Sequence, residues 1–150
     1  MTRIIYDDVS AMRPEYIEDI GDCTEVIYEN RETYIVEQNI KSVLRTMAHY
    51  YNTDLKANRI NYGEVLNIVN NVPIVFSDKH ILVPFKARKP LNKRDGAYGY
   101  VNLYKYADCG KLDKTNYILL NNSIKLKLNQ RLRPFKKRLS LAVQLINERR

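Results

Sequence analysis

The chain has 150 residues, of which 45% are hydrophobic and 28% are charged, and its formal net charge is +8. This apolar content excludes a disordered chain, and every apolar run is too short to cross a membrane. We expect a single domain over residues 1–150 that buries its own core, with Cys23 and Cys109 reduced because their spacing matches neither a metal site nor a disulfide framework.

Charge is divided unevenly along the chain. Residues 1–40 contain three Lys or Arg against ten Asp or Glu, whereas residues 41–150 contain 22 against seven. The second section therefore has a net charge of +15, which favours nucleic acid or another polyanion as its partner. The acidic first section either shields part of this field or faces a different partner.

The first third of the chain predicts a hairpin followed by a helix. Residues 1–11 are expected to be loose at the surface. Two short strand-like runs within Thr24–Val36 surround Asn30-Arg31, which is the pattern of a hairpin. The helix is predicted because five apolar residues have the spacing of one helix face, namely Ile40, Val43, Leu44, Met47 and Tyr51.

A second helix and a second hairpin follow. The helix is predicted over Leu55–Val69, with its cap in Asn52–Asp54. The hairpin is predicted because Val72–Phe76 and Ile81–Phe85 are rich in β-branched and aromatic residues, with a polar segment between them. That polar segment contains His80, which we interpret as part of a solvated turn and not as half of an acid–base pair.

Directly after this hairpin lies the most basic stretch of the chain, Lys86–Arg94. Five of these nine residues are cations and none is acidic. Cations this close together repel one another unless an anion meets them. We therefore interpret this basic loop as a polyanion-binding element, the alternative being a solubilising surface loop. Its cations are Lys86, Arg88, Lys89, Lys93 and Arg94.

Beyond the basic loop, one alternating strand is predicted over Tyr98–Tyr106, and Asp108–Asn116 is predicted to be a polar connection. A third hairpin is expected around Asn121-Asn122, with Lys125 and Lys127 on one cationic face.

The chain closes with a helix predicted over Pro134–Asn147. Its basic start, which includes Arg133 and Lys137, is unfavourable with the helix dipole and so favours an anionic ligand. The buried stripe is expected to contain Phe135, Leu139, Ala142, Val143 and Ile146. The whole pattern predicts an α+β fold, with antiparallel hairpins and three helices in a single compact domain.

Signals of enzymatic chemistry are weak. The two histidines lie near no nucleophile motif, and the five glycines form no phosphate-binding loop. The carboxylates are concentrated in the acidic first section, where a solvated face is the simplest interpretation. We therefore expect a protein that is not an enzyme, with no catalytic residues, no metal and no cofactor.

Several short motifs occur in a characteristic order: Met12-Arg13-Pro14, Tyr34-Ile35-Val36, Tyr50-Tyr51-Asn52, Asn58-Arg59, Val72-Pro73-Ile74, Ile81–Phe85, Asn121-Asn122 and Pro134-Phe135. This order resembles the ComK family of bacterial competence transcription factors over nearly the whole chain from Met12. The chain resembles a divergent member, since it has no Trp and its second strand ends in Val83-Pro84-Phe85.

The resemblance implies a cytoplasmic activator of the genes for DNA uptake, associated with the nucleoid when bound to DNA. It also implies binding to paired A·T-rich promoter boxes in double-stranded DNA, largely through the minor groove and phosphate backbone, by a homo-oligomer. Family members are handed to a Clp protease by an adaptor protein. A narrow A·T minor groove has enhanced negative potential, which attracts Arg and Lys.

The predicted DNA contacts are all cations. We expect Arg88, Lys89 and Arg94 to contact the groove or phosphates. We expect five others to hold the DNA backbone, namely Lys86, Lys93, Arg59, Arg133 and Lys137.

Three alternative functions stay open. An RNA-binding regulatory module fits the same charge, because counterion release does not distinguish DNA from RNA. The others are an enzyme acting on nucleic acid and a protein–protein regulator that uses the acidic first 40 residues.

Overall fold

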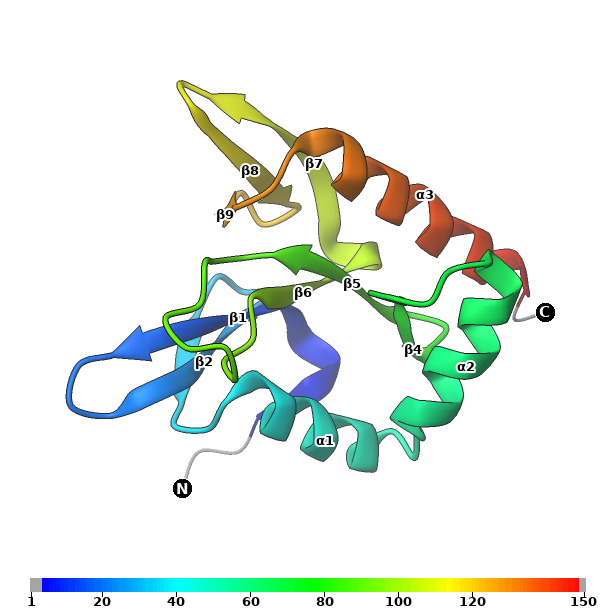
Figure 1. Cartoon of the computed structure of the whole chain (residues 1–150), viewed down its shortest axis with the longest axis horizontal. Coiled ribbons are helices and arrows are strands. Elements are labelled where there is room, and N and C mark those ends of the chain that lie inside the picture. Colours follow the sequence, from blue (N-terminus) through cyan, green and yellow to red (C-terminus); the bar gives the residue numbers. More distant parts are fainter. Residues whose placement is uncertain (1–3, 149–150) are drawn as a thin grey trace.

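Two antiparallel sheets and three α-helices make up the computed structural model, which describes residues 4–148 (Figure 1). The larger sheet has six strands in the order β3-β2-β1-β6-β5-β4, and the smaller has three in the order β7-β8-β9. The predicted α+β class, with antiparallel hairpins and three helices in one compact domain, is confirmed.

The strands are β1 (Val9–Ile17), β2 (Gly21–Tyr28), β3 (Thr33–Val36), β4 (Ile74–Ser77), β5 (His80–Lys86), β6 (Tyr98–Asn102), β7 (Tyr106–Leu112), β8 (Thr115–Leu120) and β9 (Lys125–Leu128). The helices are α1 (Ile40–Tyr50), α2 (Leu55–Leu66) and α3 (Leu132–Glu148), with 3-10 turns η1 (Tyr6–Asp8) and η2 (Leu103–Lys105).

The larger sheet is covered on both faces. Helix α1 packs against one face, where Met47 joins a core cluster with Met12 and Leu82. Helix α3 and the smaller sheet cover the other face, around Phe85 and Phe135. In Figure 1, α1 runs below the larger sheet and α3 runs above it. Because both faces are covered, β5 is buried from His80 to Phe85 without the alternation of a half-exposed strand. Within residues 4–148, no helix combines the length and apolar character needed to span a membrane.

The first two helices begin where the sequence predicts. Asn39 Oδ1 accepts a hydrogen bond of 2.9 Å from the Ser42 amide at the start of α1, and Asp54 Oδ1 accepts one of 2.9 Å from the Ala57 amide at the start of α2. The predicted end of α2 at Val69 is wrong. The helix ends at Leu66 because Asn67 adopts a left-handed backbone with φ 56°, a conformation that Asn tolerates better than most residues.

The prediction of a loose segment over residues 1–11 is wrong from Tyr6 onward, while residues 1–3 lie outside the described residues. Val9 and Ala11 are fully buried, and β1 pairs with both β2 and β6. Pro14 makes this strand difficult to predict from the sequence. It is tolerated because β1 pairs with β6 only at Ala11 and Met12, so one edge of β1 has no partner strand beside Pro14.

Tyr98–Tyr106 is not one strand as predicted. Strand β6 ends at Asn102, whose side chain accepts a hydrogen bond of 3.2 Å from the Tyr104 amide and begins the turn η2. The predicted polar connection Asp108–Asn116 is also wrong, since most of it belongs to β7 and β8. Strand β7 buries only Cys109 and so shows no apolar alternation in the sequence.

Helix α3 begins at Leu132, two residues before the predicted start. Phe135, Leu139 and Ala142 are buried as predicted. Val143 was placed in the buried stripe wrongly, because its side chain is 48% exposed. Leu145 continues the i, i+3 spacing from Ala142 and is fully buried in its place.

Candidate nucleic-acid interface

The basic loop connects β5 to β6 and is anchored at both ends. Its first residue, Lys86, exchanges backbone contacts with the segment before α3, because its amide donates to Gln130 Oε1 at 2.8 Å and its carbonyl accepts from the Asn129 amide at 2.7 Å. After Lys86, the amides of Ala87 and Arg88 both donate to the carbonyl of Ala97, at 2.8 and 3.2 Å. The loop is therefore a closed structure with fixed ends.

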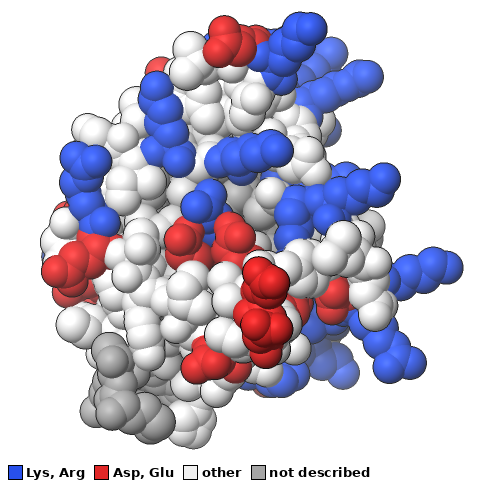
Figure 2. All heavy atoms as spheres, turned by 90° about the vertical axis from the view of Figure 1, so that its left-hand side faces the viewer, with Lys and Arg blue, Asp and Glu red and all other residues white. Residues whose placement is uncertain are grey.

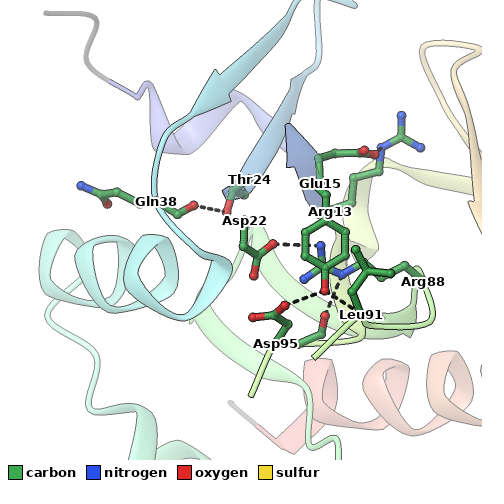
Figure 3. A network of polar contacts seen from close by, with 10 residues as sticks. Arg13, Glu15, Asp22, Thr24, Gln38, Arg88, Leu91 and Asp95 are labelled. Atoms are coloured by element: carbon green, nitrogen blue, oxygen red, sulfur yellow. Dashed lines mark hydrogen bonds and ion pairs between the residues drawn. The ribbon is translucent and has the colours of Figure 1, made fainter. Parts of the chain in front are cut away.

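Arg88 differs from the other cations of the basic loop, because it points into the protein. Its side chain is only 12% exposed, and its Nη1 lies 2.8 Å from Oδ1 of Asp22 on β2. Its Nε donates to the carbonyl of Gly96 at 2.9 Å, and its guanidinium carbon lies 4.0 Å from the ring centroid of Tyr16 on β1 (Figure 3). An ion pair and a cation–π contact thus join the loop to the β1–β2 hairpin.

Tyr16 makes the second connection between the β1–β2 hairpin and the loop. Its hydroxyl donates to Asp95 Oδ2 at 2.7 Å and accepts from the Leu91 amide at 2.8 Å. Figure 3 shows Arg88, Leu91 and Asp95 of the loop segment beside Asp22 of β2. We call the four side chains of Tyr16, Asp22, Arg88 and Asp95 the loop clamp. The clamp fixes the middle of the loop, where the exposed cations are.

Three cations of the basic loop face solvent. Lys89, Lys93 and Arg94 are exposed, and Lys86 is half-buried. None of these four has an ion-pair partner within the part of the chain that the structure describes. Charges held together without counter-charges create a positive potential that an anion would relieve.

The start of α3 adds two predicted contacts near the loop. Arg133 and Lys137 are exposed on the first turns of this helix, and the hydrogen bonds of Lys86 to residues 129–130 bring the loop beside the segment that precedes them. The structure therefore groups Arg133 and Lys137 with the beginning of the basic loop, although the two segments are far apart in the sequence.

Arg59 is not part of the loop surface. It lies on α2 at a cavity of about 380 Å³ that it shares with Lys41 and Arg45 of α1. Arg59 is the one predicted DNA contact that lines this cavity, since Lys41 and Arg45 are not among the cations predicted to bind DNA. The structure therefore divides the predicted contacts between two surfaces, one at the loop and one at this cavity.

The predicted cationic face of the β8–β9 hairpin is confirmed. Lys125 and Lys127 are exposed while Leu126 and Leu128 are buried, as alternation requires. The ammonium of Lys125 lies 5.0 Å from the ring centroid of Tyr117 on the neighbouring strand β8. This face is a further basic surface on the smaller sheet.

The charges are unevenly distributed on the face drawn in Figure 2. Lys and Arg side chains are crowded along the right-hand edge of this view, with further ones at its left and centre, while most Asp and Glu side chains lie across its middle. The −7 and +15 sections of the sequence thus give a surface with an acidic region and a basic region. A polyanion would meet the basic region first.

The interpretation of His80 as part of a solvated turn is wrong. His80 is 2% exposed, because the β4–β5 hairpin buries it beside Phe76 and Tyr51. The Tyr51 hydroxyl donates its one proton to Asp7 Oδ1 at 2.6 Å, so its contact of 3.0 Å with His80 Nδ1 requires the proton to be on Nδ1. His80 Nε2 is buried with no hydrogen-bond partner among the described residues. Burial lowers the pKa of His80 to about 4, with a smaller lowering by Lys105 and an opposing effect of Asp7.

The buried His80 should make the protein less stable in acid. Its pKa is about 4 when folded and 6.5 when exposed, so the unfolded chain binds the proton more tightly. Stability is therefore complete above pH 6.5 and falls as the pH drops toward 4, by about 3 kcal/mol from this group. Urea unfolding at pH 7 and pH 4 should show a larger loss for the natural chain than for His80→Gln. Equal losses would contradict the assignment.

The loop clamp is the part of the interface that sequence reasoning missed. None of Tyr16, Asp22 and Asp95 is among the residues predicted from the sequence to bind DNA. No local pattern connects them, since Tyr16 and Asp95 are 79 positions apart. Charge alone could have indicated the clamp, because a dense cationic loop can form ion pairs with carboxylates in an acidic section of the same chain.

The chain was compared with protein families, with curated proteins and with solved structures. The family model described as ComK protein matches residues 4–149. No curated protein and no solved structure matches the chain.

Proposed function

We propose that this chain, which belongs to the ComK family of competence transcription factors, binds double-stranded DNA at promoters through its basic loop. The resemblance found in the sequence is confirmed by the match over nearly the whole chain, and the family is one of transcription factors, not of enzymes. We further propose that residues 1–150 act as one DNA-binding domain.

The observation that carries this proposal is the clamped basic loop. Lys89, Lys93 and Arg94 are exposed without ion-pair partners among the described residues, on a loop whose backbone is fixed by Tyr16 and Arg88. A flexible loop would lose conformational entropy on binding, whereas a clamped loop has already lost it on folding. The three cations are therefore ready to meet phosphates or a narrow groove.

We propose that Arg88 positions the basic loop and does not contact DNA. The sequence predicted that Arg88 contacts DNA, but its side chain is occupied by Asp22, Gly96 and Tyr16. Moving it to DNA would leave Asp22, which is 17% exposed at its side chain, without its counter-charge. We assign the predicted DNA contacts to Lys89, Lys93 and Arg94, with Lys86, Arg133 and Lys137 on the backbone. Arg59 instead lines the cavity that it shares with Lys41 and Arg45.

The exposed side chain of Leu91 supports binding through the minor groove of DNA. It follows Pro90 in the middle of the loop, its side chain is 83% exposed, and its amide is held by Tyr16. Proteins that bind the minor groove commonly insert an apolar side chain between base pairs and surround it with cations. A·T-rich steps suit this mode, because their narrow groove attracts cations and TA steps unstack readily. We propose that Leu91 is such a wedge.

Replacing Leu91 by Ala should reduce DNA bending without changing the electrostatics. We expect an affinity loss of about tenfold, from the apolar burial that a full Leu side chain supplies. The slope of log affinity against log salt should stay constant, since no phosphate contact is removed. Energy transfer between dyes at the two ends of a duplex would report the bend. Leu112→Ala, at an apolar side chain 57% exposed on the smaller sheet, is the matched control, and unchanged bending in Leu91→Ala would reject the wedge.

Two further parts of the proposal concern other proteins. Strand β3 forms one edge of the larger sheet, and a sheet edge is able to pair with a second copy. Such an oligomer would suit paired promoter boxes. Transfer to a Clp protease by an adaptor protein stays a prediction that the family resemblance implies.

Titration of nucleic acids at several salt concentrations tests the proposed function. We expect an A·T-rich duplex to bind more tightly than a G·C-rich duplex of the same length, with steep salt dependence for both. Structured RNA of equal charge should bind less tightly than the A·T-rich duplex. A preference for RNA would favour the RNA-binding alternative and overturn the proposal.

A further inference from the structure

The cavity between α1 and α2 combines a cationic rim with an apolar floor. Lys41 and Arg45 stand on α1 and Arg59 stands on α2. The floor is built by α1, α2 and the larger sheet, and its residues are Leu44, Leu55, Val72, Ile74, Pro84 and Tyr100. Three cations from two helices thus converge over a floor of aliphatic carbon and one aromatic ring.

The three rim cations have no counter-charge. All three are exposed, no acidic residue lines the cavity, and none of the three forms an ion pair within residues 4–148. Arg45 donates only to the hydroxyl of Ser42, at 3.1 Å. Lys41 and Arg45 are one helical turn apart, a spacing at which like charges destabilise a helix. An anion in the cavity would remove this repulsion.

The floor indicates a ligand with an apolar body. A DNA phosphate needs only charge and hydrogen bonds at a surface, and would leave the aliphatic floor unused. Pockets for small ligands combine apolar walls with a few convergent polar groups. Tyr100 adds an aromatic ring to the lining, and burial raises the pKa of its hydroxyl to about 12. The volume of about 380 Å³ suits a compact molecule.

We infer that this cavity binds a small organic phosphate, with the phosphate group held by Lys41, Arg45 and Arg59 and an apolar or aromatic body resting on the floor. Arg binds phosphate with two parallel hydrogen bonds and Lys binds it as a point charge, so the rim supplies both kinds of contact. No residue of the basic loop lines the site, and the inference does not depend on DNA binding. Its ligand would give the transcription factor a way to respond to a metabolite.

Three probes separate charge from apolar contact: phenyl phosphate, glucose 6-phosphate and inorganic phosphate. Each would be titrated into the ¹⁵N-labelled full chain and followed by amide chemical shifts. We expect phenyl phosphate to bind about tenfold more tightly than the other two, since only it covers the apolar floor. The largest shifts should lie at the cavity and not in the basic loop. Equal affinities for the three phosphates, or shifts centred on the loop, would overturn the inference.

Variants identify the residues responsible. Arg59→Ala and Arg45→Ala should each weaken phenyl phosphate binding by about tenfold, the usual effect of losing a charged hydrogen bond. Lys79→Ala removes an equal charge from the exposed β4–β5 turn and should leave binding unchanged. The triple loop variant Lys89→Ala, Lys93→Ala, Arg94→Ala should also retain binding even if it loses DNA. Binding that persists in Arg59→Ala and Arg45→Ala would contradict the site, whatever the outcome for DNA.

Discussion

Replacing Lys89, Lys93 and Arg94 together by Ala is expected to flatten the salt dependence of DNA binding by about two to three units of slope. Each phosphate contact contributes about 0.9 to the slope of log affinity against log salt on duplex DNA. These three side chains are exposed on a loop whose backbone is held by Tyr16, and they have no ion-pair partner within the described residues, so each is free to make one such contact. Fluorescence anisotropy of a labelled A·T-rich duplex at four or more salt concentrations measures the slope.

The matched control removes the same charge from other surfaces. Lys56 on α2, Lys79 in the β4–β5 turn and Lys111 on β7 are all exposed. Their triple replacement by Ala lowers the net charge equally and should change the slope little, because these residues lie outside the loop. If both triple variants flatten the slope to the same extent, the overall charge binds DNA and the loop has no special role.

Replacing Arg88 by Ala should destabilise the fold, in contrast to the three exposed cations. Its guanidinium is 12% exposed, pairs with Asp22 and stacks on Tyr16. Removing one partner of such a pair leaves the other charge poorly solvated, which costs about 2–4 kcal/mol in a site of this burial. DNA affinity should fall as well, because the loop loses its clamp, while the salt slope should change by less than one contact. Chemical unfolding together with the salt titration gives both values.

Two conservative variants sharpen the test of Arg88. Arg88→Lys keeps the charge but loses the planar group that stacks on Tyr16 and donates to Gly96, so it should rescue only part of the stability. Tyr16→Phe removes the hydroxyl that contacts Leu91 and Asp95 and should loosen the loop without removing any charge. If Arg88→Ala is as stable as the natural chain and its salt slope falls by about 0.9, the value of one phosphate contact, then Arg88 contacts DNA directly.

The sequence was most informative where structure follows from local periodicity. Helix α1, the β4–β5 hairpin and the β8–β9 hairpin agree with the predictions, because each has a continuous apolar pattern of one period. Strand β1 was missed since Pro14 and its many polar residues interrupt that pattern. Strand β7 was missed because it buries only Cys109. In both strands, pairing with neighbouring strands stabilises the extended backbone, although the local sequence favours it only weakly.

The candidate site shows the same limit more sharply. The basic loop could be found from charge density alone, but charge density does not separate Lys89, which is exposed, from Arg88, whose side chain is only 12% exposed. That difference depends on Asp22 and Tyr16, which the fold brings to the loop from the β1–β2 hairpin. The cavity could not be predicted either, because Arg45 and Arg59 lie on separate helices whose relative placement no local pattern determines.

We propose that the clamped loop reads the minor groove of A·T-rich DNA. A duplex in which inosine–cytosine pairs replace A·T pairs tests this most directly, because it has the functional groups of G·C in the major groove but lacks the guanine amino group in the minor groove. We expect the natural chain to bind this duplex about as tightly as the A·T duplex and more tightly than the G·C duplex, and we expect Leu91→Ala to reduce this preference. Binding to the inosine duplex at the level of the G·C duplex would contradict it.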